Sequence, residues 1–103
     1  MGNLGYPYTP THPGEVIKEE IEYRGISQKV LSQQMGVSYS MLNEILNGKR
    51  PVSIELALLM EAALGINADL LVRMQTDYNM QTARKNTTLM EKLNQIRKIA
   101  AVF

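Results

Sequence analysis

Apolar residues recur at intervals of three and four along most of this chain, with short polar or glycine-containing stretches between the runs. This spacing is typical of amphipathic helices, because residues three and four apart lie on the same helix face. No segment shows the strict alternation of polar and apolar residues that marks a half-buried strand. The pattern therefore predicts an all-α protein built from short helices.

Each predicted helix begins at a residue that suits a helix start. Pro13 fits the first helical position, because its missing N–H needs no partner there. The later helices are preceded by Ser or Asn, whose side-chain oxygen can accept a hydrogen bond from the first turn. The capping residues are Ser27, Ser38, Ser53 and Asn67. The first four helices are expected to stop at Gly25, Gly36-Val37, Asn47-Gly48 and Gly65, and the fifth to reach Tyr78. Residues 79–86 fit either a loop or a continuation of the fifth helix, and Thr88-Leu-Met-Glu91 has the capping-box pattern expected to open a sixth.

The apolar positions also predict which side chains are buried. Those expected to fill the wedge between the second and third helices are Val30, Leu31, Val37, Leu42 and Ile45. Helix 54–64 is apolar nearly all round, so it is either central or covered by another element. The fifth helix is expected to turn Leu70, Leu71, Met74 and Tyr78 inward.

Residues 28–46 have the spacing of a helix-turn-helix, with two helices joined by the three-residue turn Met35-Gly-Val37. Gly36 suits a tight turn that requires positive φ, where a Cβ atom is penalised. The second helix of the pair carries hydrogen-bonding side chains outward, as a helix that reads base edges in a major groove does. The predicted base-reading residues are Gln28, Ser38, Tyr39, Ser40, Asn43 and Glu44. Ser38 has the simpler alternative of only capping its helix, and Tyr39 that of lying on the surface.

Cations and amides flank this pair of helices, where a DNA backbone would run. The predicted phosphate-contacting residues are Lys29, Asn47, Lys49 and Arg50. Contacts of this kind provide affinity and register, whereas base contacts provide sequence preference. The net charge of the whole chain is only +1, but residues 26–51 sum to +2 and residues 84–103 to +4, whereas residues 1–25 and 52–83 sum to −2 and −3. This distribution is consistent with a nucleic-acid footprint.

The composition offers little to a catalyst. The chain has no cysteine and one histidine, so a transition-metal site would need almost only carboxylates, and no metal or other cofactor is predicted. No nucleophile–base pair or glycine-rich phosphate loop is present, so we do not expect an enzyme. His12 directly precedes Pro13 and is interpreted as a helix N-cap rather than a ligand. No apolar run is long enough to span a bilayer, so no membrane association is expected.

Several segments together resemble one family of Xre/Cro-like helix-turn-helix proteins, the HigA-type antitoxins. The segments that carry the resemblance are His12-Pro-Gly-Glu15, Gly25-Ile-Ser-Gln28, Gly36-Val-Ser38, Ile45-Leu-Asn-Gly-Lys-Arg-Pro51, Glu55-Leu-Ala-Leu58, Ala63-Leu-Gly65 and Gln75-Thr-Asp-Tyr78. They cover roughly residues 12–80. Two positions depart from the family pattern: Ser32 stands where a small Ala is frequent, and Glu44 stands where Arg is common.

The resemblance implies a cytoplasmic antitoxin that neutralises a RelE/HigB-like mRNA-cleaving toxin and, as a homodimer on double-stranded operator DNA, represses its own operon. The alternative is a stand-alone Xre-family repressor with no toxin. A third possibility, a protein-interaction module that has lost DNA binding, is kept open by Glu44 and the modest net charge.

The predicted organisation is a flexible segment 1–11, a five-helix helix-turn-helix domain 12–80 and an amphipathic helical extension 81–103. Along the extension, apolar residues alternate at gaps of four and three, the spacing of a coiled-coil seam. These residues are Leu89, Leu93, Ile96, Ala100 and Phe103. They are expected either to pack on the chain's own core or to form a dimer seam or toxin-binding surface.

Overall fold

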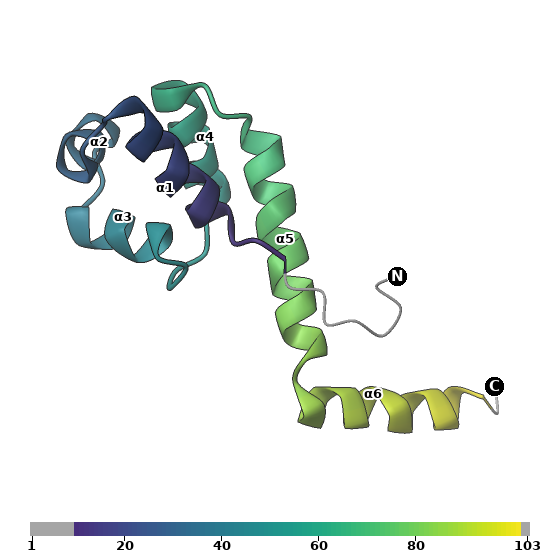
Figure 1. Ribbon diagram of the computed structural model, residues 1–103. Helices are drawn as coiled ribbons and strands as arrows, with labels where there is room; N and C mark the ends of the chain where they lie inside the picture. Colours follow the sequence, from purple (N-terminus) through teal and green to yellow (C-terminus); the bar gives the residue numbers. More distant parts are fainter. Residues whose placement is uncertain (1–9, 102–103) are drawn as a thin grey trace.

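The computed structural model describes residues 10–101 of the 103-residue chain, and in that range it is entirely helical apart from short connections (Figure 1). The helices are α1 (Pro13–Arg24), α2 (Gln28–Met35), α3 (Tyr39–Leu46), α4 (Ile54–Leu64), α5 (Ala68–Arg84) and α6 (Thr87–Ala100). The prediction of an all-α domain with an additional C-terminal helix is confirmed. Residues 79–84, for which the sequence left two possibilities, continue α5.

The predicted caps account for where the first five helices begin. His12 Nδ1 accepts a hydrogen bond from the Gly14 N–H, and the caps of α2 to α5 accept from the residue three positions on. The start of α6 was predicted wrongly. Asn86, and not Thr88, is the N-cap, and its Oδ1 lies 3.0 Å from the Leu89 nitrogen. Asn is among the strongest N-caps, so its amide begins the helix two residues before the capping box would.

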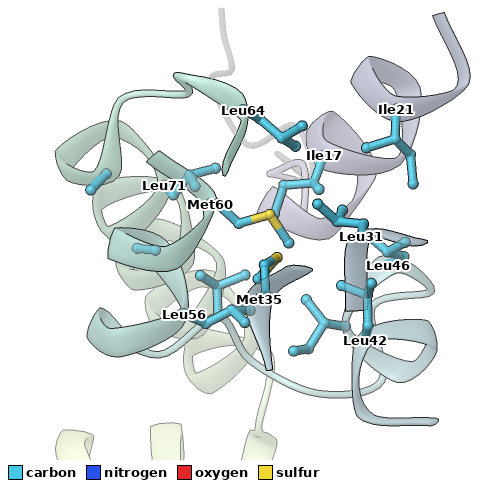
Figure 2. Close-up of a cluster of buried hydrophobic side chains, with 14 residues drawn as sticks. Ile17, Ile21, Leu31, Met35, Leu42, Leu46, Leu56, Met60, Leu64 and Leu71 are labelled. Atoms are coloured by element: carbon cyan, nitrogen blue, oxygen red, sulfur yellow. The ribbon is translucent and has the colours of Figure 1, made fainter. Parts of the chain in front are cut away.

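One apolar core joins α1 to α5. Ile17, Leu31, Leu42, Met60 and Leu71, one from each of these helices, are fully buried. Figure 2 shows Met35 of α2 and Met60 of α4 near the middle of the cluster, with side chains of α1, α3 and α5 around them. α4 packs against α2 and α5 and buries one side in this core, while Ile54 and Leu58 on its other side are exposed, so α4 is not a central helix.

Two residues predicted to be buried are not. Val30 is 47% exposed, because it lies on the outer side of α2 while Leu31 and Ser32 face α3. Leu70 is also exposed, and its neighbour Leu71 occupies the inward position of α5. Periodicity alone does not choose between adjacent apolar residues when both lie near the edge of a helix face.

α6 does not pack on the core. Figure 1 shows α5 running out of the bundle and α6 turning away from the end of α5. No residue of α6 is buried, which excludes the expectation that its stripe covers the chain's own core. The radius of gyration is 17.5 Å, compared with about 13 Å for a compact chain of this length. Phe103, the last residue of the predicted stripe, and most of the predicted segment 1–11 lie outside the described residues.

Candidate nucleic-acid interface

The turn between α2 and α3 holds the two helices at a fixed angle. Gly36 has φ +70°, a conformation in which other residues are strained, so the glycine is needed here as predicted. The Val37 N–H donates to the Ser32 carbonyl at 3.0 Å and closes the turn. Ser32 is buried, and its hydroxyl donates to the Lys29 carbonyl at 2.8 Å. Serine thus replaces the small Ala of the resembled family without leaving a buried hydroxyl unsatisfied.

The start of α3 presents polar side chains to solvent. Tyr39 and Ser40 are exposed in the first turn of the helix. Ser38 Oγ accepts from the Met41 N–H at 3.0 Å, so this side chain caps α3. Its hydroxyl proton is not used by that bond, because the oxygen acts there as the acceptor. The capping role predicted for Ser38 is confirmed, and a contact to a base remains a prediction.

Gln28 of α2 and Asn43 of α3 meet across the helix-turn-helix. The Asn43 amide nitrogen donates to Gln28 Oε1 at 3.0 Å, and both residues are half-buried. Asn47 continues this network, since its amide nitrogen donates to the Asn43 carbonyl at 2.8 Å. The bonds restrict the rotamers of all three side chains. A side chain that is already ordered loses less conformational entropy when it contacts DNA.

Glu44 and Arg50 form an ion pair beside this network. Arg50 Nε donates to Glu44 Oε1 at 2.9 Å, and Nη2 approaches the same oxygen at 2.8 Å. Both side chains are half-exposed, so the pair lies at the surface. The sequence predicted that Glu44 reads a base and that Arg50 contacts a phosphate, with no contact between the two side chains. In the structure the carboxylate neutralises the guanidinium and restricts its direction.

The loop that follows α3, residues 47–53, carries Lys49 and Arg50 and is fixed from two sides. On one side, Gln75 Oε1 of α5 accepts from the buried Val52 N–H at 2.8 Å. On the other, the His12 ring lies 3.7 Å from the position that a Cβ atom would take on Gly48. The loop cations therefore project from a backbone held by α5 and by the start of α1.

His12 joins the first helix to this loop. It is buried and stacks edge-on with Tyr78 of α5, with ring centroids 4.9 Å apart. Burial lowers the pKa of the imidazole below its usual 6.5, against the opposing effects of the Glu15 charge and a hydrogen bond to the Arg50 backbone. A neutral ring is also what the cap requires, because Nδ1 accepts from the Gly14 N–H at 2.9 Å. The N-cap interpretation of His12 is confirmed.

Gln75 and Lys18 belong to the site but were not predicted as part of it. The Lys18 ammonium lies 3.4 Å from Asn47 Oδ1, which brings a cation of α1 to the end of α3. A polar residue at an inward position of an amphipathic helix was the available signal for the buried role of Gln75.

Among residues 10–101, no three His, Asp or Glu side chains come close enough together to hold a metal ion. In the same range no helix is long and apolar enough to cross a membrane. Lys29, Lys49 and Arg50 are all exposed, and they lie on the two elements that flank the polar face of α3. This surface offers hydrogen-bond donors, acceptors and cations.

Comparison with known proteins agrees with this geometry. The family model described as helix-turn-helix matches residues 17–71, which is over half of the chain. Virulence-associated protein I of Dichelobacter nodosus is 33% identical over 76 residues, which cover 73% of this chain and 70% of that protein. The structure of an addiction module antidote protein of the HigA family from Coxiella burnetii superimposes with a TM-score of 0.72, at 26% identity over 82% of this chain and 95% of that one.

The antitoxin HigA of Pseudomonas aeruginosa, solved with its higBA promoter, also has a TM-score of 0.72, at 27% identity over 81% of this chain and 92% of that one. The matched residues 17–71 include the whole helix-turn-helix and its following loop. The chain therefore belongs to the helix-turn-helix family, in the Xre-like group that includes the HigA-type antitoxins.

Proposed function

We propose that this protein is an antitoxin that binds operator DNA through α3 and represses its own operon as a homodimer. The observation that carries the proposal is the α2–α3 pair, in which the polar face of α3 is flanked by the exposed cations of α2 and of loop 47–53. The comparison proteins include a HigA antitoxin solved with promoter DNA. No arrangement in residues 10–101 suggests catalysis, and a binding function without cofactor is proposed.

The proposed contacts divide into two groups. Tyr39, Ser40 and Asn43 read base edges in the major groove, with Gln28, Ser38 and Glu44 supporting or adding to that contact. Lys29, Asn47, Lys49 and Arg50 contact phosphates. The hydrogen bonds among Gln28, Asn43 and Asn47 support an ordered contact surface, because they join the start of α2 to α3 and to the residue that follows it. The paired Arg50 makes a weaker phosphate contact than Lys49 in this proposal, since Glu44 competes for its guanidinium.

The proposed dimer fits the geometry of DNA. Two recognition helices can occupy successive major grooves when they are separated by one helical turn, about 34 Å. A two-fold symmetric protein then matches an inverted repeat. The operator of this protein is proposed to have that symmetry, and its base sequence to differ from those of relatives with Arg at the position of Glu44.

The second partner is proposed to be a cognate toxin of the RelE/HigB-like, mRNA-cleaving class, in the cytoplasm. Support comes from the similar structures reported above, which include an addiction module antidote protein of the HigA family. Residues 12–80 would carry DNA binding, and residues 81–103, which begin inside α5, would form an extension of it.

A coupled binding titration tests the proposal. The product of the open reading frame adjoining this gene is titrated against the full chain, and promoter DNA is then added. Binding of both, with each ligand changing the affinity for the other, supports an operator-binding antitoxin. Salt-dependent promoter binding without any toxin contact would replace it by a stand-alone repressor. Absence of promoter binding at low salt would contradict both functions.

A further inference from the structure

α6 carries an apolar stripe that the described chain covers only at its start, where Leu89 and Leu93 are half-buried near the end of α5. The stripe is formed by Leu89, Leu93, Ile96 and Ala100, and Ile96 is 49% exposed. On a helix wheel of 100° per residue, Lys92 and Arg97 flank the stripe on its two sides. α6 is thus an apolar strip with a cation along each edge.

α4 has a second exposed apolar stripe, on the side opposite to the core. It is formed by Ile54, Leu58 and Ala62, with Leu58 54% exposed. On the same helix wheel, Glu55 and Glu61 flank this stripe. Here the apolar strip has an acid along each edge.

A groove continues the α4 stripe toward α2. Two adjoining cavities, of about 180 and 350 Å³, share Met35 of α2 and Leu59 of α4 in their walls. One reaches the helix-turn-helix turn at Gly36 and Val37, and the other reaches Ala62 and Ala63 near the end of α4. The two cavities therefore lie beside the α4 stripe, on its α2 side, and Glu55 lines one of them.

The net charge of the C-terminal residues favours an acidic partner surface for α6. Residues 84–101 sum to +4, so two α6 helices brought side by side would repel each other. Residues 52–83, which contain α4 and most of α5, sum to −3. Opposite charges across an interface favour the correct pairing, and like charges suppress the wrong one.

We infer that α6 of one protomer docks on the α4 stripe of a second copy of this chain, and that the exchange is reciprocal. This rests on the dimer of the proposed function and specifies its interface. Ile96 and Leu58 pack at the centre, and Lys92 and Arg97 meet the acids at the edges. The α6 stripe, from Leu89 to Ala100, spans about 17 Å and is long enough to cover the α4 stripe, which spans about 12 Å from Ile54 to Ala62 at 1.5 Å per residue. Two-fold symmetry makes the contact twice and doubles the buried area.

Sedimentation of the full chain with three substitutions tests the interface. Leu58→Asp and Ile96→Asp each place a charge at the centre of one stripe, and both positions are exposed enough for the monomer to fold. Each is expected to raise the dimer dissociation constant about 30-fold or more, as loss of a central apolar contact does. Tyr23→Asp is the control, because Tyr23 is 90% exposed on α1 and belongs to neither stripe. Its dimer is expected to match that of the unchanged chain.

Mixing the two variants separates this interface from a symmetric one. The Leu58→Asp chain keeps an intact α6, and the Ile96→Asp chain keeps an intact α4 stripe. A mixture therefore restores one of the two contacts and is expected to associate more tightly than either variant alone. Pairing of α6 with α6, or of α4 with α4, gives no such recovery and would overturn the inference.

Charge reversal on α6 gives an independent result. Lys92→Glu with Arg97→Glu is expected to weaken association, and adding Glu55→Lys to recover part of it. Stronger association of the α6 double variant would indicate α6–α6 pairing instead. If the α6 double variant associates as the original chain does but binds DNA more weakly, α6 binds phosphates. If the original chain is a monomer at about 100 μM, there is no dimer contact. Each of these three results overturns the inference.

The DNA assay distinguishes failure of this interface from failure of the proposed function. If the unchanged chain forms the α6–α4 dimer but binds no promoter, the interface stands and the proposed function fails. If Leu58→Asp is as dimeric as the unchanged chain and promoter binding is intact, the proposed function stands and the interface fails.

Discussion

Adding a single methyl group at Gly14 should destabilise this fold strongly. Gly14 lies in the first turn of α1, where the backbone passes directly over the end of α3. A Cβ atom built on Gly14 would lie 1.9 Å from the Ile45 carbonyl oxygen and 2.9 Å from its carbon. Both atoms belong to the backbone, so no side-chain rotamer can relieve the overlap. We therefore expect Gly14→Ala to force α1 and α3 apart.

The size of the effect follows from that overlap. Real Cβ contacts are not closer than 3.0 Å, so the two backbones must separate by about 1 Å. Such a shift loosens Ile17 and Ile45, which are both almost fully buried, and overpacking of this kind costs about 1–3 kcal/mol. It also displaces the Gly14 N–H from the His12 cap, worth about 1 kcal/mol. We expect Gly14→Ala to lower the free energy of unfolding by about 2–4 kcal/mol.

Urea unfolding followed by circular dichroism measures this change, with Gly25→Ala as the matched control. Gly25 has φ +69°, but a Cβ atom there would meet nothing within 4 Å. Its replacement therefore costs only backbone strain, about 1–2 kcal/mol. Equal or smaller destabilisation by Gly14→Ala than by Gly25→Ala would refute the close approach of α1 and α3. Because the Ile45 carbonyl also accepts from the Gly48 N–H, folded Gly14→Ala protein should in addition bind promoter DNA less tightly.

Three further predictions concern the site. The pKa of His12 lies below 6.5 in the folded state, so below that pH the unfolded chain binds more protons than the folded one, and stability should be level above pH 6.5 and fall toward pH 5. The urea midpoint of His12→Asn should not show this fall. A His12→Asn midpoint that falls with pH as steeply as that of the unchanged chain would contradict the prediction. Lys49→Ala should weaken binding to all DNA sequences alike and reduce the slope of log K against log salt by about one unit per half-site. Arg50→Ala should reduce that slope less, because Glu44 already pairs with the guanidinium. Equal slopes for the two variants would show that the Glu44–Arg50 pair opens on DNA. Ser40→Ala and Asn43→Ala should instead relax the preference at individual base pairs, as measured by competition with substituted operators, and uniform losses would place these residues on phosphates.

The sequence predicted the helices well because their ends are local events. Ser27, Ser38 and Ser53 each cap the helix that they precede, and Gly36 takes the positive φ that the turn requires. Contacts between helices were less predictable. Nothing in the spacing indicates that Gln75 reaches the Val52 N–H, because that contact depends on how distant elements pack. The turn of Arg50 back onto Glu44 was also open, because it depends on the path of the loop that follows α3. The path of α6 was likewise open, since an amphipathic stripe is the same whether it covers its own core or another chain.

The pairing of Glu44 with Arg50 has a consequence for how DNA binding would be controlled. Near α3, one half-site meets the exposed cations Lys29 and Lys49, the half-buried Lys18, and Arg50, which shares its charge with Glu44. Because non-specific affinity rises with the number of phosphates neutralised, a single protomer should bind weakly at physiological salt. Joining two protomers makes the second half-site contact intramolecular and raises the affinity without any new contact. Operator occupancy would then follow the concentration of dimer, so any partner that competes for the α4 stripe or for α6 would release the promoter without touching α3.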